Sequence, residues 1–210
     1  EPIAIIGRGV IVPGANGIAE LRTLLNNRHV QLREPPEDRW RGRIGIEAAG
    51  SPPWRIPTAR GGYLVDYAYD WRKHKVPPKQ VSRANPLQFM LLDAAGQAID
   101  EAIGSTGRLN AAQTSVIVGT VFGGEFGHQL QMGLRLVELR RDLLSALRPE
   151  QVSNDECATI LADFEERFLI AQPALLDETG SFTSSTLASR ITKQYNLMGG
   201  AMAIDAGDAS

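Results

Sequence analysis

The residues whose side chains are most clearly suited to chemistry are two aspartates, Asp205 and Asp208, which stand three positions apart near the C-terminal end. The apolar run Ala201–Ile204 precedes them and follows a Gly199–Gly200 turn, so the pattern predicts a buried strand over 201–204. Asp208 then stands where this strand is expected to give way to a helix. Aspartate suits that place because its carboxylate accepts hydrogen bonds from the first backbone amides of a helix. One interpretation of Asp208 is therefore structural: it holds the turn.

The chain begins with the segment Glu1–Gly9, followed by Pro13-Gly14-Ala15, and it ends with the stretch Asp205–Ser210. Both stretches resemble the β-ketoacyl synthase family. Its end resembles the family motif Val-Asp-(Thr/Ala)-Ala-Cys-(Ser/Ala)-Ser, in which Asp205 matches the aspartate, and we expect Asp205 to be buried and paired. In this alignment Asp208 takes the place of the active cysteine. The resemblance thus marks Asp208 as the catalytic position, occupied by a residue that we do not expect to act as a nucleophile.

Further matches follow in the same order as in the family. Asn85-Pro86-Leu87-Gln88 resembles the family's Asp-Pro-Gln-Gln-Arg, with Phe89 in place of the arginine, and Ala188-Ser189-Arg190-Ile191 resembles Ala-Asn-Arg-Ile. Asp66–Asp70 matches an acidic and aromatic stretch. The long segment between Gly124 and Gly180 is most similar to ketosynthases of polyunsaturated fatty acid and related polyketide synthases.

The resemblance implies the fold and the partners. The family has the thiolase fold, in which two similar α/β halves pack together, and this chain would be the first half, with a mixed sheet covered by helices. Residues 1–210 would form one ketosynthase N-terminal domain that ends at the nucleophile turn. The expected partners are an acyl carrier protein and either the C-terminal half of the fold or a ketosynthase partner subunit, in a dimer. The two catalytic histidines of the family would lie beyond this chain.

The substitution at position 208 decides the chemistry that the resemblance implies. In the family, the helix N-terminus lowers the pKa of the cysteine thiol, and the thiolate takes an acyl group from a carrier-protein thioester. An acyl-aspartyl anhydride would be more reactive than the thioester that formed it. The negative charge of Asp208 would also repel a malonyl carboxylate. We therefore expect a domain that does not condense, similar to a chain-length factor or another non-condensing partner of fatty acid or polyketide assembly.

A second hypothesis stays open. The chain is then an active β-ketoacyl synthase, which performs decarboxylative Claisen condensation of carrier-protein thioesters, captured as a Cys-to-Asp variant or as a fragment. This hypothesis requires a second half that carries the histidines and a thiol at position 208 in the native gene.

Composition excludes several other functions. The 210 residues carry a net charge of −2 and an isoelectric point near 6.0, which offers no basic surface for nucleic acid. No apolar run approaches the ~20 residues of a membrane helix, and we expect a cytoplasmic protein. The single cysteine, Cys157, cannot form an internal disulfide.

Other chemical motifs are incomplete. The three histidines lack the spacing of a metal site and are expected on the surface or in loops: His29, His74 and His128. Gly7-Arg8-Gly9 suggests a dinucleotide fingerprint, but Val12 occupies the place of the third glycine. The serines near position 185 lack a Gly-x-Ser-x-Gly elbow. We expect neither a cofactor nor a metal.

Periodicity predicts alternating strands and helices, which favours an α/β layer fold. The expected strands cover residues 3–6, 61–66, 114–118 and 201–204. The expected helices cover residues 17–27, about 86–104, about 125–147, from 154 to about 169, and 186–195. Asn16 and Asn85 are candidate helix caps, and Ser153 with Glu156 forms a capping box. Residues 34–57, which contain five prolines, are expected to form a long loop.

Overall fold

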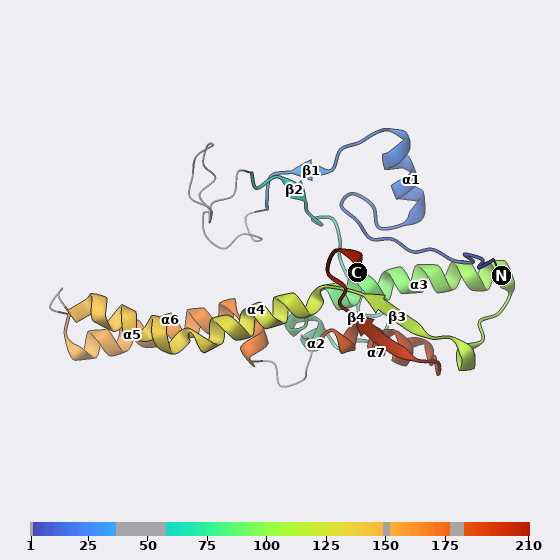
Figure 1. The fold of residues 1–210 in the computed structure, drawn as a ribbon. Helices are drawn as coiled ribbons and strands as arrows, with labels where there is room; N and C mark the ends of the chain where they lie inside the picture. The colour runs from blue at the N-terminus through green and yellow to red at the C-terminus, as the bar shows by residue number, and fades with distance from the viewer. Residues whose placement is uncertain (1, 37–57, 149–151, 177–182) are drawn as a thin grey trace. The chain divides into compact units, whose positions relative to one another are not determined.

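A computed structural model describes residues 2–36, 58–148, 152–176 and 183–210, and most of the predicted proline-rich loop lies outside these residues. The chain divides into two compact units (Figure 1). The first contains the residues up to Lys73 together with Phe89–Leu109, and the second contains His74–Gln88 and the residues from Asn110 to Ser210.

The first unit is built on helix α3 (Leu87–Thr106), which belongs to this unit from Phe89 onward. It also contains helix α1 (Ile18–Asn26) and a short antiparallel pair, β1 (Leu32–Arg33) with β2 (Gly61–Gly62). The predicted cap of α3 is confirmed, since Asn85 Oδ1 accepts a hydrogen bond from the Leu87 amide at 2.9 Å. The predicted cap of α1 is wrong, because Gly17 occupies the N-cap position.

Residues Ile6–Val10, near the start of the chain, lie along α3 and not in a sheet. Gly7 and Gly9 pass so close to α3 that a Cβ on either would collide with a backbone carbonyl of the helix. Arg8 forms an ion pair with Glu101 that raises the pKa of the guanidinium and lowers that of the carboxyl, chiefly through their side-chain hydrogen bond. The prediction of a strand over Ile3–Ile6 is wrong, because in the described part of the chain these residues pair with no strand.

The second unit contains the sheet that precedes the candidate site. Strands β3 (Val116–Gly119) and β4 (Ala201–Ile204) pair in parallel, with Val116 opposite Ala201 and Gly119 opposite Ile204. Helix α7 (Ser185–Tyr195) packs on both strands and buries Leu187, Ala188 and Ile191. The bounds of both strands and of α7 agree with the sequence predictions to within two residues. The prediction that residues 201–204 are buried is wrong, because Met202 and Ile204 of β4 are 48% and 46% exposed. Helix α2 (Pro78–Arg83) and the 3-10 turn η1 (Ala111–Gln113) complete this part of the unit.

The same unit extends into a helical hairpin (Figure 1). Helices α4 (Phe122–Leu134) and α5 (Leu136–Leu147) follow almost without a break, separated only by Arg135, as the single predicted helix required. Helix α6 (Asn154–Ala171) packs on α5, and the 3-10 helix η3 (Pro173–Leu176) packs on α4. The predicted capping box is confirmed: the Glu156 amide donates to Ser153 Oγ, and the Ser153 amide donates to Glu156 Oε2.

These elements make a mixed α/β fold with small sheets, as the resemblance implied. Among the described helices, none combines the length and the apolar composition needed to cross a membrane.

Candidate functional site

The candidate site is the turn that follows β4. Parallel pairing with β3 continues past the strand, because the Thr120 amide donates to the Ile204 carbonyl at 2.9 Å. The backbone then changes direction at Gly207, whose φ of 59° lies in the left-handed region that glycine tolerates best. The 3-10 helix η4 (Gly207–Ala209) follows, and Asp208 is its central residue. Asp208 thus stands just beyond the carboxyl end of a strand.

The turn is held by its own hydrogen bonds. The Ala206 amide donates to Ser210 Oγ at 2.6 Å, and the Gly207 amide donates to Asp205 Oδ1 at 3.1 Å. The Ala209 and Ser210 amides donate to the carbonyls of Ala206 and Gly207. These bonds occupy the amides on both sides of Asp208, so the turn is a closed local structure.

Glycine at position 119 lets this turn approach the end of β3. A Cβ on Gly119 would lie 2.8 Å from the carbonyl carbon and 3.2 Å from the Cα of Ser210. Real Cβ atoms almost never approach another atom that closely. The small residue at the end of β3 is therefore a condition for the observed position of the turn.

The two aspartates of the motif are both exposed. The expectation that Asp205 is buried and paired is wrong, since its carboxylate lies at the surface and bonds within the turn. The reason is local: an aspartate two residues before a tight turn readily accepts the amide of that turn and needs no distant partner. Asp208 presents its carboxylate to solvent at the tip of η4.

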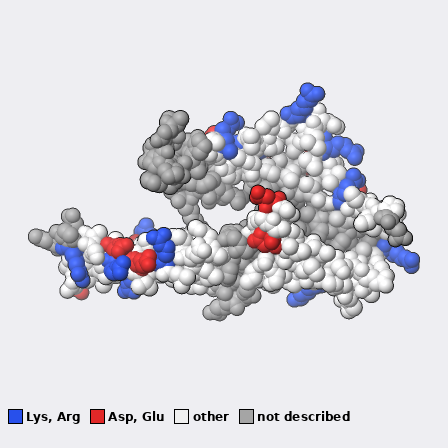
Figure 2. All heavy atoms as spheres, in the orientation of Figure 1, with Lys and Arg blue, Asp and Glu red and all other residues white. Residues whose placement is uncertain are grey.

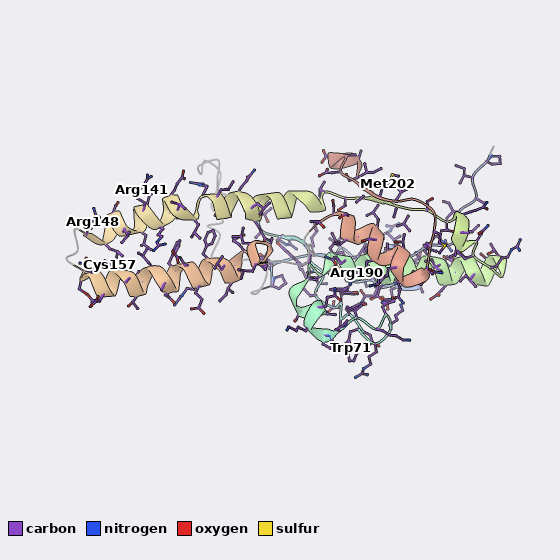
Figure 3. All side chains as sticks on the ribbon, turned by 90° about the horizontal axis from the view of Figure 1, so that it is seen from below. Trp71, Arg141, Arg148, Cys157, Arg190 and Met202 are labelled. Carbon is purple, nitrogen blue, oxygen red and sulfur yellow. The ribbon has the colours of Figure 1, made fainter. Side chains whose placement is uncertain are left out.

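Helix α7 supports β4 and is anchored by a buried polar contact. Gln88 is almost fully buried, and its Oε1 accepts a hydrogen bond from Arg190 Nε at 3.0 Å. Figure 3 labels Arg190 on α7 and Met202 on the neighbouring strand β4. Gln88 and Arg190 both come from stretches that resemble family motifs. The sequence thus located the residues but not their contact.

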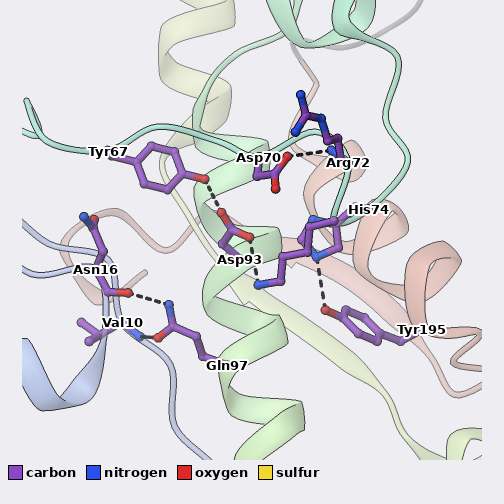
Figure 4. Close-up of polar contacts among 10 residues, drawn as sticks. Val10, Asn16, Tyr67, Asp70, Arg72, His74, Asp93, Gln97 and Tyr195 are labelled. Atoms are coloured by element: carbon purple, nitrogen blue, oxygen red, sulfur yellow. Dashed lines mark hydrogen bonds and ion pairs between the residues drawn. The ribbon is translucent and has the colours of Figure 1, made fainter.

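The histidines do not gather at the turn. His29 and His128 are exposed, as predicted for surface histidines. His74 lies in the turn of residues 71–75, as predicted for a loop histidine, but it is buried, with its Nε2 3.5 Å from the Tyr195 hydroxyl at the end of α7 (Figure 4). A histidine in a polar stretch gives no sign of burial in the sequence, because its burial depends on the docking of α7.

A second polar cluster, in the first unit, was not predicted. The Tyr67 hydroxyl donates to Asp93 Oδ2 at 2.7 Å, and Lys73 Nζ lies 3.3 Å from Asp93 Oδ1 (Figure 4). Burial, followed by the Asp93 carboxylate, raises the pKa of Tyr67 far above its usual range. A phenol that keeps its proton in this way fastens the 66–73 segment to α3. The sequence carries two signals of this cluster: Asp93 is a charged residue within the apolar pattern of α3, and Tyr67 lies in the acidic and aromatic stretch Asp66–Asp70.

The described residues contain no group of three or more His, Cys, Asp or Glu side chains that could hold a metal ion. Gly7 and Gly9 serve close packing on α3, and Ser185 begins helix α7. The turn after β4 is therefore the candidate that the sequence and the fold support together.

Comparison with known proteins identifies the family. The model of the "Beta-ketoacyl synthase, N-terminal domain" matches residues 1–210. One subunit of the phenolphthiocerol/phthiocerol polyketide synthase of Mycobacterium tuberculosis is 28% identical over 124 residues, which are 58% of this chain. Polyketide synthase PksN of Bacillus subtilis is 32% identical over 124 residues, or 57% of this chain. The matches span only 8% and 2% of those two proteins.

A solved structure gives the same assignment for the fold. The ketosynthase from module 6 of the bacillaene synthase of Bacillus subtilis superposes with a TM-score of 0.54 at 18% identity. The superposition covers 96% of this chain and 26% of the other. The fold agrees with the first half of a thiolase-like architecture, and the family match extends over the whole sequence. The chain belongs to the β-ketoacyl synthase family, as an N-terminal domain.

Proposed function

We propose that this chain is part of a ketosynthase domain of polyketide or fatty acid assembly, and that Asp208 stands at the position of the nucleophilic cysteine. The placement of Asp208 carries the proposal. It lies one residue into a tight turn at the carboxyl end of β4, directly after the Asp205-Ala206-Gly207 stretch that resembles the family motif. The names of the related proteins, which are polyketide synthases, support the assembly context.

With Asp208 at that position, the domain does not condense. Acyl transfer needs a nucleophile whose acyl product is no less stable than the donor thioester, and a cysteine thiolate meets this requirement. A carboxylate would give a mixed anhydride, which water hydrolyses. The carboxylate also places a negative charge where a malonyl group would have to approach. The domain then serves as a non-condensing partner that shapes the acyl site of another subunit, in the manner of a chain-length factor.

The partners follow from this role. An acyl carrier protein would deliver the chain, and a C-terminal half or a ketosynthase subunit would complete the fold in a dimer. The exposure of Asp208 and of the whole turn is consistent with a site that other parts of the assembly cover.

The alternative is an active β-ketoacyl synthase in which only the nucleophile is missing. The continuity of the family match through residue 210 favours it, as does the support of the turn by β3, Gly119 and α7. These features would present a cysteine at position 208 equally well.

An acylation experiment separates the two. The complete protein that contains this chain is incubated with an acyl carrier-protein thioester, and its intact mass is measured. We expect no acyl adduct on the unaltered protein. Under the non-condensing proposal, Asp208→Cys also stays unmodified, whereas under the alternative it gains one acyl group and then condenses with malonyl carrier protein. Asp208→Asn is the control, because it removes the negative charge of Asp208, as the cysteine variant does, but supplies no thiol. It stays unmodified in both cases. A stable adduct on the unaltered protein, removed by Asp208→Asn, would refute both.

A further inference from the structure

Helix α4 continues into α5 with its helical register intact. Arg135 separates the two helices, and its backbone is helical, with φ of −82° and ψ of −7°. Its amide donates to the Gln131 carbonyl at 3.3 Å, and its carbonyl accepts a hydrogen bond from the Leu139 amide at 2.9 Å. Bonds between residues four positions apart thus pass through the junction. Side chains on the two helices therefore share common faces.

One of these faces is covered within the hairpin. Helix α4 packs on η3, and α5 packs on α6. The side chains of this face are half-buried: Met132, Leu136, Leu139, Leu143 and Leu147. A surface helix normally needs only one apolar face of this kind.

A second line of side chains follows the opposite side of the two helices. Its members recur at alternating intervals of four and three positions, the spacing of the a and d positions of a coiled coil. We call this line the outer seam: Leu130, Leu134, Val137, Arg141, Leu144 and Arg148. Its first three residues have 41%, 82% and 77% of their surfaces exposed. The seam therefore has the pattern of a helix–helix contact, with its apolar half open to solvent.

The other half of the outer seam is basic. Arg141 lies on the side of α5 turned away from α6 (Figure 3), and its nearest acid, Asp142, is 3.7 Å away in an exposed pair of the kind that contributes little. Arg140, outside the seam, is already used within the hairpin, since its Nη1 lies 2.8 Å from Glu165 Oε1. Figure 2 shows basic and acidic groups side by side over the hairpin, but none of the six seam positions carries an acid.

These charges disfavour a second copy of the same seam as the partner. A parallel copy would place Arg141 against its own counterpart, and like charges would meet. An antiparallel copy with the seams fully overlapped would place Arg141 against Val137 and Arg148 against Leu130. Each guanidinium would then be desolvated without a carboxylate. A helix with carboxylates at the facing positions satisfies both halves of the seam.

We propose that the outer seam is a docking surface for an acidic amphipathic helix of another protein. Apolar side chains of that helix cover Leu130, Leu134 and Val137, and its carboxylates pair with Arg141 and Arg148. The seam spans 18 helical steps, which at 1.5 Å per residue is about 27 Å, so the partner helix has about five turns. It runs antiparallel to α4 and α5, because its acidic end is then its N-terminal end, where carboxylates stabilise the helix dipole.

A designed peptide tests this surface on the complete protein that contains the chain. The probe has three heptads, about 21 residues, with alanine and glutamine outside the a and d positions. Its a and d positions carry leucine, except for two glutamates in the N-terminal half. Fluorescence anisotropy is expected to show binding that weakens as salt is added, and hydrogen exchange should slow in residues 130–148. The same peptide with lysines in place of the glutamates should bind about 10-fold more weakly.

Substitutions in the apolar half test where the peptide binds. Leu134→Ala/Val137→Ala is expected to weaken binding of the acidic peptide about 30-fold, because apolar area is lost from the contact. Leu25→Ala/Val30→Ala makes the same two changes at exposed positions elsewhere and should leave binding unchanged. Circular dichroism verifies that each variant keeps its helical content. Sedimentation velocity should show the same oligomeric state for all of them, and a change in the seam variant would identify a second copy as the occupant and overturn the proposal.

Charge reversal tests the basic half. Arg141→Glu/Arg148→Glu should weaken binding of the acidic peptide about 10-fold and strengthen binding of the lysine peptide. Arg22→Glu/Arg108→Glu changes the net charge equally at two exposed positions and should alter neither affinity. Absence of binding by the acidic peptide would overturn the proposal, as would a charge-reversed protein that keeps the original preference. Equal binding of a peptide whose glutamates lie in its C-terminal half would overturn the antiparallel arrangement. The seam shares no residue with the turn after β4, so acylation of position 208 neither supports nor contradicts this surface.

Discussion

Helix α7 and the turn after β4 lie in the same unit but hold their polar groups in opposite ways. On α7, Arg190 bonds to Gln88, a buried side chain that lies 102 positions earlier in the sequence. In the turn, the side chains of Asp205 and Ser210 accept hydrogen bonds from amides two and four positions away and remain exposed. From this difference we expect helix α7, with its buried long-range contact, to contribute more to the stability of the unit than the turn does. Substitutions should therefore act strongly in the supporting helix and weakly within the turn.

The largest effect is expected in the apolar face of α7. Leu187→Ala removes most of a side chain that is almost fully buried, and it should lower the free energy of unfolding by about 2–5 kcal/mol. Denaturant unfolding of the unaltered and variant chains measures this loss. Leu176→Ala, at an exposed position of η3, should change the same quantity by less than about 0.5 kcal/mol. Equal losses of unfolding free energy at the two positions would contradict the larger contribution expected from the buried face of α7.

The next largest effect is expected at the hydrogen bond between Gln88 and Arg190. Arg190→Met leaves the buried amide of Gln88 without this donor, which should cost about 1–3 kcal/mol. Gln88→Leu combined with Arg190→Met should recover part of the loss, because both polar groups are then absent. A double-mutant cycle from thermal or denaturant unfolding gives the coupling, expected at about 0.5–3 kcal/mol. Strict additivity would mean that the hydrogen bond does not anchor α7.

A substitution at Gly119, where the end of β3 meets the turn, should lower the free energy of unfolding by a similar amount. Gly119→Ala places a Cβ against the backbone of Ser210, which should cost about 1–3 kcal/mol or displace the turn. Faster hydrogen exchange of the amides of residues 206–210 would reveal a displacement. Gly104→Ala is the control, because a Cβ there meets no atom within 4 Å, and it should stabilise α3 by about 0.5–1 kcal/mol. Unchanged exchange and stability in Gly119→Ala would show that the turn does not depend on this glycine.

A smaller effect is expected where hydrogen bonds are again local, at the start of α6. Ser153→Ala removes the side-chain cap of the helix and should cost about 1 kcal/mol. Ser145→Ala makes the same change inside α5, where the hydroxyl donates only to the Arg141 carbonyl, and should be close to neutral. Thermal unfolding of both variants checks the difference. A loss at position 145 as large as that at 153 would contradict the capping role.

The smallest effect is a dependence of α6 on pH. Hydrogen bonds from the side chain and the amide of Ser153 lower the pKa of Glu156 below its ordinary value of 4.5. Because the folded-state pKa is the lower one, the stabilisation is complete above the unfolded pKa and is lost as the pH falls through the folded pKa. Glu156→Gln should therefore flatten the stability profile below about pH 4.5, measured by unfolding at several pH values. An unchanged profile would exclude this carboxylate as its source.

Local physics explains what the sequence predicted. Ser153 with Glu156 and Asn85 before a proline determine helix starts through bonds to amides two or three residues away. The short apolar run Ala201–Ile204 after two glycines predicted β4 with the bounds that the structure has. The motif resemblance, carried by a few residues in a fixed order, predicted the family that the comparisons confirm.

Only the tertiary structure decided the rest. Ile3–Ile6 has the composition of a strand, yet only the residues that follow it, around Gly7 and Gly9, lie against α3, and a strand exists only where another strand accepts its hydrogen bonds. His74 is buried because Tyr195 at the end of α7 lies beside it, and Asp205 is exposed because its turn supplies a nearby amide. The sequence alone determined the residue types, the local caps and the family. Burial and long-range pairing depend on which distant segments meet, and no short window of the sequence contains that information.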